Sequence, residues 1–162
     1  MVFLVESMVL CVLFAAAVVP PVIRNPIGAI HDYPPAIAER AIELGLTTQK
    51  HRRTSKGVVI VKAMVAIALA CILAAVVRYI NRAEGFLQGA QISYGLWMVI
   101  NWFDALVLDC LWFCHSKRVM IPGTEDMKEY KDYLFHIKAG CIGSVIGIPV
   151  AMLVGCIVMF LV

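Results

Sequence analysis

Four long apolar segments constrain this chain more than any other feature of its sequence. They cover residues 2–23, 57–80, 91–114 and 137–162, and nearly all of the charged residues lie between them. A helix rises about 1.5 Å per residue and a bilayer core is about 30 Å thick, so about 20 apolar residues span it. Each segment reaches that length. The sequence therefore predicts an all-α polytopic membrane protein with four transmembrane helices.

The composition supports a single integral membrane domain over residues 1–162. Of the 162 residues, 62% are hydrophobic, whereas a soluble domain has about 45–50% apolar residues. Four spans leave too little chain for a separate soluble domain. No Lys or Arg precedes Arg24, so the basic start of a cleaved signal peptide is missing. We expect the lipid bilayer as the main partner, and no nucleic acid.

The distribution of basic residues predicts the orientation of the spans. Lys and Arg concentrate in the first and third connections, and the second connection carries only two of them. The positive-inside rule then places the first and third connections in the cytoplasm and both termini outside, in the plasma (inner) membrane. The basic residues of the two cytoplasmic connections are Arg24, Arg40, Lys50, Arg52, Arg53, Lys56, Lys117, Arg118, Lys128, Lys131 and Lys138, and those of the second are Arg78 and Arg82.

Short cytoplasmic helices are predicted in both longer connections. In the first, a helix begins at Pro35, because proline suits a first helical turn, and stops at Gly45. In the second, Thr124 is a candidate cap for a helix that continues through His136 into the last span. Pro20 and the proline after it should end or bend the first span.

The third span carries two carboxylates inside an apolar segment. A carboxylate at the bilayer centre costs about 2.5–3.5 kcal/mol, so such residues usually face the interior of a bundle. At 100° per residue, Asp104 shares one face with Asn101, whereas Asp109 lies about 140° away. We expect this face to line a polar cavity that binds a small ligand. The predicted ligand-binding residues are Asp104, Asn101, Tyr94, Trp97, Trp112 and Asp109.

Histidine and aspartate near the cytoplasmic ends of the spans suggest a second kind of site. These are residue types that transfer protons in enzymes. The alternative is a purely interfacial role, since polar aromatic rings suit the headgroup layer. The candidate catalytic residues are His31, Asp32, His115 and His136.

A metal or cofactor is not predicted. Cys110 and Cys114 lie four residues apart, but His115 points about 100° away from Cys114. A structural zinc site needs four ligands at familiar spacings, and no Cys-x-x-Cys is present. The six cysteines all fall in predicted spans, where cysteine behaves as a small buried hydrophobe.

Small residues recur every four positions in the last span. Such a pattern lets two helices approach closely. Its partner is either another span or a second copy of the chain, so a homodimer through these residues is one alternative. The repeating residues are Ala139, Gly143, Gly147, Ala151 and Gly155.

Three functions are compatible with these features. The favoured one is a protein that binds or transports a small amphipathic or cationic ligand, with Asp104 as the charge partner. The second is a membrane-embedded enzyme that acts on a lipid-like substrate at the cytoplasmic interface. The third is an accessory subunit of a membrane complex, whose work is done by the small residues of the last span.

Overall fold

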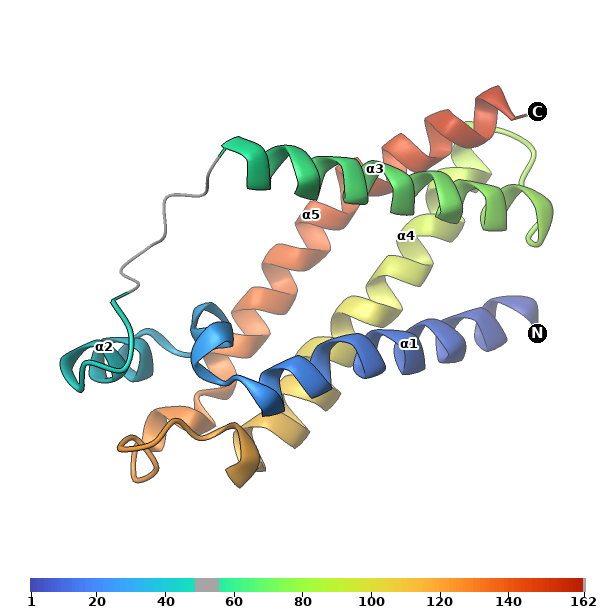
Figure 1. Ribbon diagram of the computed structural model, residues 1–162. Helices are drawn as coiled ribbons and strands as arrows, with labels where there is room; N and C mark the ends of the chain where they lie inside the picture. Colours follow the sequence, from blue (N-terminus) through green and yellow to red (C-terminus); the bar gives the residue numbers. More distant parts are fainter. Residues whose placement is uncertain (49–55, 162) are drawn as a thin grey trace. The chain divides into compact units, whose positions relative to one another are not determined.

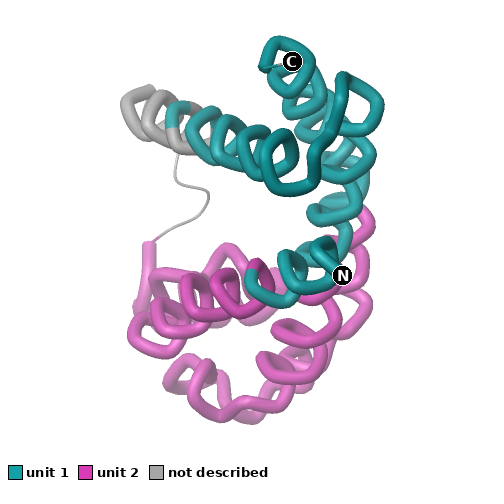
Figure 2. Tube along the Cα trace, turned by 90° about the vertical axis from the view of Figure 1, so that its right-hand side faces the viewer, with its two compact units in different colours: residues 1–9, 53–101, 142–162 teal, residues 10–52, 102–141 magenta. Residues whose placement is uncertain are grey.

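The computed structural model describes residues 1–48 and 56–161 of the chain (Figure 1). Every regular element in these ranges is helical. Lys50, Arg52 and Arg53 of the first connection lie outside the described residues. The chain divides into two compact units, which Figure 2 shows in different colours. Unit 1 comprises residues 1–9, 53–101 and 142–162, and unit 2 comprises residues 10–52 and 102–141.

Within the described residues, three helical segments are long and apolar enough to cross a membrane. They are α1 (Val2–Arg24), the segment Phe86–His115, and α5 (Tyr133–Phe160). A fourth helix, α3 (Lys56–Tyr79), has 24 residues, and its described apolar part is Ile67–Tyr79. The two consecutive prolines do not end α1, which continues to Arg24.

In unit 1, α4 (Phe86–Phe103) packs against α5 through glycines on both helices. A Cβ atom at Gly155 would lie 2.6 Å from the carbonyl oxygen of Phe86, and one at Gly89 would lie 3.0 Å from Val158. A Cβ atom at Gly147 would overlap the ring of Trp97. The small residues of the last span therefore pack against the third apolar segment within this chain.

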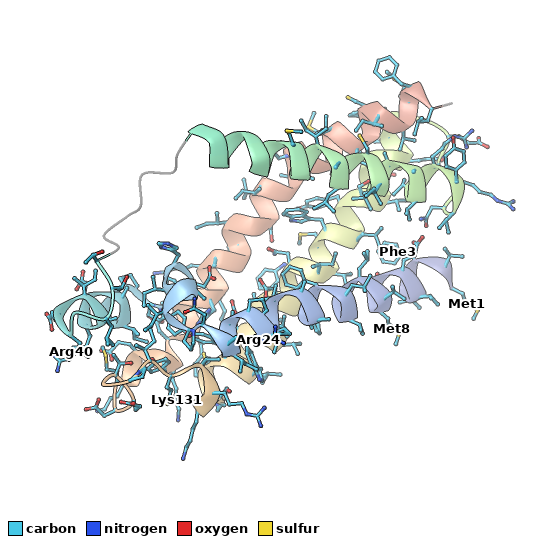
Figure 3. All side chains as sticks on the ribbon, viewed as in Figure 1. Met1, Phe3, Met8, Arg24, Arg40 and Lys131 are labelled. Atoms are coloured by element: carbon cyan, nitrogen blue, oxygen red, sulfur yellow. The ribbon has the colours of Figure 1, made fainter. Side chains whose placement is uncertain are left out.

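In unit 1 a polar contact joins the start of α1 to the chain just after α3. The side-chain amide of Asn81, just after α3, donates to both carboxylate oxygens of Glu6 at 2.9 and 3.0 Å. Phe3 of α1 points toward α4 in Figure 3, where a Cβ atom at Gly95 would lie 3.1 Å from its ring. Met8, also labelled there, is 71% exposed. Most of the large apolar side chains of α1 in unit 1 are exposed in the same way.

Unit 2 contains a packed core built from the two longer connections, which we call the connector core. It joins η1 (Ile27–Asp32) and α2 (Pro35–Glu43) to η3 (Phe113–His115) and to the segment that follows, with η4 (Lys117–Val119) and η5 (Lys128–Lys131). The buried residues of the connector core are Ile30, Tyr33, Ile37, Ala41, Phe113, Cys114, Val119, Ile121 and Tyr130.

Two buried tyrosines hold the connections together by hydrogen bonds. The hydroxyl of Tyr33 donates to the carbonyl oxygen of Val119 at 2.7 Å. The hydroxyl of Tyr130 accepts from the backbone N–H of Ile121 at 2.8 Å and lies 2.7 Å from the hydroxyl of Thr124. These contacts satisfy polar groups that burial would otherwise leave unpaired.

The start of α5 differs from the prediction. Thr124 does not cap a helix, because its hydroxyl donates back to the carbonyl oxygen of Ile121 at 2.8 Å. The cap is Asp132, whose carboxylate accepts from the backbone N–H of Phe135 at 3.0 Å. The chain between Thr124 and Asp132 contains the short 3-10 helix η5. Thr124 itself is buried beside the connector core.

Candidate functional site

A π-helix interrupts the third apolar segment where its two carboxylates lie. α4 ends at Phe103, and η2 (Asp104–Trp112) continues it as a π-helix. The predicted α-helical geometry beyond Phe103 is therefore wrong. π-helical hydrogen bonds join residues five apart, so Asp104 and Asp109 lie closer to one face than the 140° that separates them in an α-helix. π-helices are rare and are found frequently at functional sites.

Asp109 is paired with a buried histidine at the start of α5. Its Oδ2 atom lies 3.0 Å from Nδ1 of His136. The His136 side chain is only 2% exposed and that of Asp109 is 30% exposed. The His136 ring also makes edge contacts with Phe113 and Phe135, at centroid distances of 5.4 and 5.2 Å. The pair therefore joins a solvent-accessible carboxylate to an imidazole enclosed by aromatic rings.

The pair fixes which ring nitrogen of His136 carries hydrogen. An ionised carboxylate accepts hydrogen bonds only, so Nδ1 is the donor and Nε2 of the neutral ring is an acceptor. Within the described part of the chain, Nε2 has no hydrogen-bond partner although it is buried. A buried polar atom without a partner costs about 1–3 kcal/mol. An unpaired group of this kind requires an explanation, and a bound ligand is one.

Two more carboxylates interact electrostatically with this pair. Asp104 and Asp32 are each repelled by Asp109 and by one another, and Asp104 is attracted by His136. Among the described residues no hydrogen bond or salt bridge holds the Asp104 carboxylate, which leaves its oxygens available as acceptors. We call Asp32, Asp104, Asp109 and His136 the polar cluster. All four residues belong to unit 2.

Asp32 is the surface member of the polar cluster. It ends η1 and is exposed, as is its neighbour His31. Desolvation by the surrounding protein raises the pKa of the Asp32 carboxyl, and the negative charge of Asp109 raises it further, while His31 lowers it. In the polar cluster, the exposed carboxylate of Asp32 thus interacts with the half-buried carboxylate of Asp109. Asp109 in turn pairs with the buried imidazole of His136.

Three of the predicted ligand-binding residues contact α5 instead of lying free. The Nε1–H of Trp97 donates to the carbonyl oxygen of Gly143 at 2.9 Å. The hydroxyl of Tyr94 and the side-chain amide of Asn101 both reach Ser144, on its carbonyl oxygen and its hydroxyl respectively, at 3.3 Å each. Their polar atoms therefore fasten α4 to α5 within unit 1.

The remaining predicted residues lie around the connector core. Trp112 is half-buried against it. His115 is exposed, with Nε2 3.2 Å from the hydroxyl of Tyr133 and Nδ1 3.1 Å from the carbonyl oxygen of Leu111. His31 is exposed beside Asp32. Of the four candidate catalytic residues, the structure brings Asp32 and His136 into the polar cluster.

Sequence reasoning missed the pairing of Asp109 with His136. A helical wheel with a constant 100° step separates Asp109 from Asp104, and hydropathy carries no signal for a π-helix. The aromatic neighbours of His136 were likewise not singled out. In the described parts of the chain no group of three or more His, Cys, Asp or Glu side chains is arranged to hold a metal ion.

Comparisons of the chain with models of protein families, with curated proteins and with solved structures find no match.

Proposed function

We propose that this chain is a four-span protein of the plasma (inner) membrane, with both termini outside and the two longer connections in the cytoplasm. Three long apolar helical segments support this topology, and α3 has the length of a fourth span. The concentration of Lys and Arg in the first and third connections supports the orientation. On this topology unit 2 includes the cytoplasmic connections, and the polar cluster is reached from the cytoplasmic side.

We further propose that the polar cluster binds or transports a small organic cation. The observation that carries the proposal is the charge balance: three carboxylates interact electrostatically, and one of them, Asp109, is paired with a histidine whose ring is buried and whose Nε2 has no partner in the described residues. Carboxylates at membrane depth usually mark a substrate or ion pathway. Asp104 is the charge partner of the ligand, since its oxygens are not engaged elsewhere in the described chain.

The surroundings of the cluster favour an organic cation over a metal ion. The donors in the described residues are not arranged for metal coordination. Aromatic rings lie beside the cluster instead, with Phe113 and Phe135 against His136. An aromatic face attracts a cation within about 6 Å of its centroid, and the attraction grows when the pair is desolvated. An amphipathic cation satisfies both the carboxylates and the rings.

The proposal is tested with tetraphenylphosphonium as the probe cation. The purified protein in a mild non-ionic detergent is dialysed to equilibrium against the labelled probe. We expect saturable binding that Asp104→Asn weakens at least about tenfold, which corresponds to about 1.4 kcal/mol. Asp126→Asn removes an exposed carboxylate of the second longer connection and serves as the matched control. Equal binding by all three proteins would contradict the proposal.

A membrane-embedded enzyme is the second candidate, and one observation favours it. In His136, Nδ1 is held by a carboxylate while Nε2 is unpaired, which is the arrangement of a general base oriented by an acidic side chain. The substrate would be lipid-like and would enter at the cytoplasmic interface. Chemical turnover of a bilayer lipid by the purified protein, abolished by His136→Gln with the fold intact, would establish this alternative over cation binding.

A further inference from the structure

We infer that His136 is the proton-binding group of the polar cluster, and that a proton on its Nε2 atom and an organic cation on the carboxylates exclude one another. This inference rests on the proposed function and adds to it the exchange of the ligand for a proton. It identifies the exchanged species and the atom that holds it.

Burial decides which ligand His136 can accept. The residue is 1% exposed, and Nε2 has no hydrogen-bond partner in the described chain. Edge contacts from Phe113 and Phe135 enclose the ring. A proton is the one ligand that reaches this nitrogen without displacing those rings, because it occupies no volume. An organic cation is instead accommodated at Asp104, whose carboxylate oxygens are not engaged elsewhere in the described chain.

The hydrogen bond to Asp109 holds the His136 ring in the same position in its neutral and its protonated state. The neutral ring donates from Nδ1 to Asp109, across 3.0 Å. Adding a proton at Nε2 leaves that hydrogen bond intact and makes both of its partners charged, with opposite signs, which strengthens it. The proton comes from water or a buffer acid and returns to it, and no other bond forms or breaks. The ring can therefore charge and discharge without a change of partner at Nδ1.

The charges that face the ring make the two ligands compete. Asp109 contacts the ring from η2 at 3.0 Å, and Asp104 of η2 interacts with it electrostatically. Asp32 couples to both of these carboxylates from η1, with His31 beside it. An organic cation bound to the same carboxylates neutralises part of their charge and adds a repulsive positive charge, so it lowers the affinity of the ring for a proton.

The same coupling acts in the opposite direction. Linkage requires that the proton lowers the affinity for the cation by the factor by which the cation lowers the affinity for the proton. Affinity for the cation therefore rises as the pH rises and the ring loses its proton. Tetraphenylphosphonium suits the test because its own charge does not depend on pH, so every released proton comes from the protein.

The experiment measures binding and proton release in the same sample. Tetraphenylphosphonium is added to the protein in detergent in a weakly buffered solution at about pH 6, and the ring of His136 is followed by nitrogen-15 NMR over about pH 5 to 8. We expect protons to be released on binding and the His136 signal to move from the imidazolium to the neutral form. We expect the affinity for the probe to increase several-fold across this range.

Two variants separate His136 from the other histidines. His136→Gln is expected to bind the probe with little release and little dependence on pH. His115→Gln, which alters an exposed histidine outside the polar cluster, is expected to release protons as the native protein does. If His136→Gln fails to fold, the NMR signal of His136 in the native protein still decides the question.

The outcomes distinguish a failure of proton exchange from a failure of cation binding. Binding of the probe without proton release, or release that is unchanged in His136→Gln, overturns the proton exchange and leaves cation binding in place. A His136 ring that stays neutral over the whole range also overturns the exchange. Absence of binding in equilibrium dialysis overturns the proposed function and the exchange together.

Discussion

The two units of this chain are packed through different kinds of side chain. In unit 1, α4 and α5 meet at glycines, and hydrogen bonds run from the side chains of α4 to Gly143 and Ser144. In unit 2, large side chains such as Tyr33 and Tyr130 are enclosed in the connector core. Unit 1 exposes most of its large apolar residues, whereas the connector core buries them.

This difference in packing follows from the proposed topology, in which the helices of unit 1 meet lipid and the connector core of unit 2 meets water. Between lipid tails there is little hydrophobic force to join helices, so close contact at small residues and interhelical hydrogen bonds must hold them. In a connection that meets water, burial of apolar surface drives association at about 25 cal/mol per Å². The comparison predicts that unit 1 is sensitive to added volume and unit 2 to lost hydrogen bonds.

The largest effect is expected from Gly155→Leu in unit 1. Its Cβ atom alone would lie 2.6 Å from the carbonyl oxygen of Phe86, and a backbone atom cannot move aside as a side chain can. We expect a loss of about 3 kcal/mol in the free energy of unfolding, at the upper end of overpacking. Unfolding by dodecyl sulfate in mixed micelles measures it. Val145→Leu, at a position 66% exposed, is the control and should change little; equal losses would mean that α4 does not cover this face.

An intermediate effect is expected from Tyr130→Phe in unit 2. The change keeps the ring but removes the hydroxyl that accepts from Ile121 and contacts Thr124. A buried donor left unpaired costs about 1–3 kcal/mol. Thermal unfolding in detergent measures the loss. Tyr133→Phe removes a hydroxyl from a residue 40% exposed and should cost less than about 0.5 kcal/mol; the same cost for both variants would count against a buried network.

The smallest effect is expected from Asp32→Asn, and it depends on pH. The pKa of Asp32 is raised in the folded chain by desolvation and by Asp109, so the folded state binds its proton more tightly than the unfolded state does. The stability that this proton provides is present below the ordinary carboxyl pKa of about 3.9 and is lost as pH rises through the raised value. Asp32→Asn should therefore stabilise unit 2 at about pH 7, by less than about 0.5 kcal/mol for an exposed residue.

The measurement for Asp32→Asn is the melting temperature of both proteins across this pH range. The native protein at acid pH is its own control, because the carboxyl is then protonated in both the folded and the unfolded states. The variant and the native protein should melt at nearly the same temperature there. A larger difference at acid pH than at neutral pH would reverse the sign and contradict a raised pKa.

The positions of the long apolar helices follow from the amino-acid sequence alone. The predicted segment 2–23 corresponds to α1 and 137–162 to α5 within a few residues, because unbroken apolar composition over about 20 residues is a local property of the chain. The helix that begins at Pro35 and the left-handed backbone of Gly45, with φ of 69°, are local in the same sense. The four-residue repeat of small side chains likewise indicated a close helix contact.

Which residues contact one another depends on the tertiary structure. A repeat of glycines does not identify its partner, and the structure supplies α4. The aromatic and amide side chains of the third segment looked like ligand contacts, yet Trp97 donates to the backbone of α5. The polar cluster depends on the π-helix at Asp104–Trp112, which changes the angular step that a helical wheel assumes. The pair of Asp109 and His136 joins residues 27 positions apart, and such distant contacts depend on how the whole chain packs, which no local pattern records.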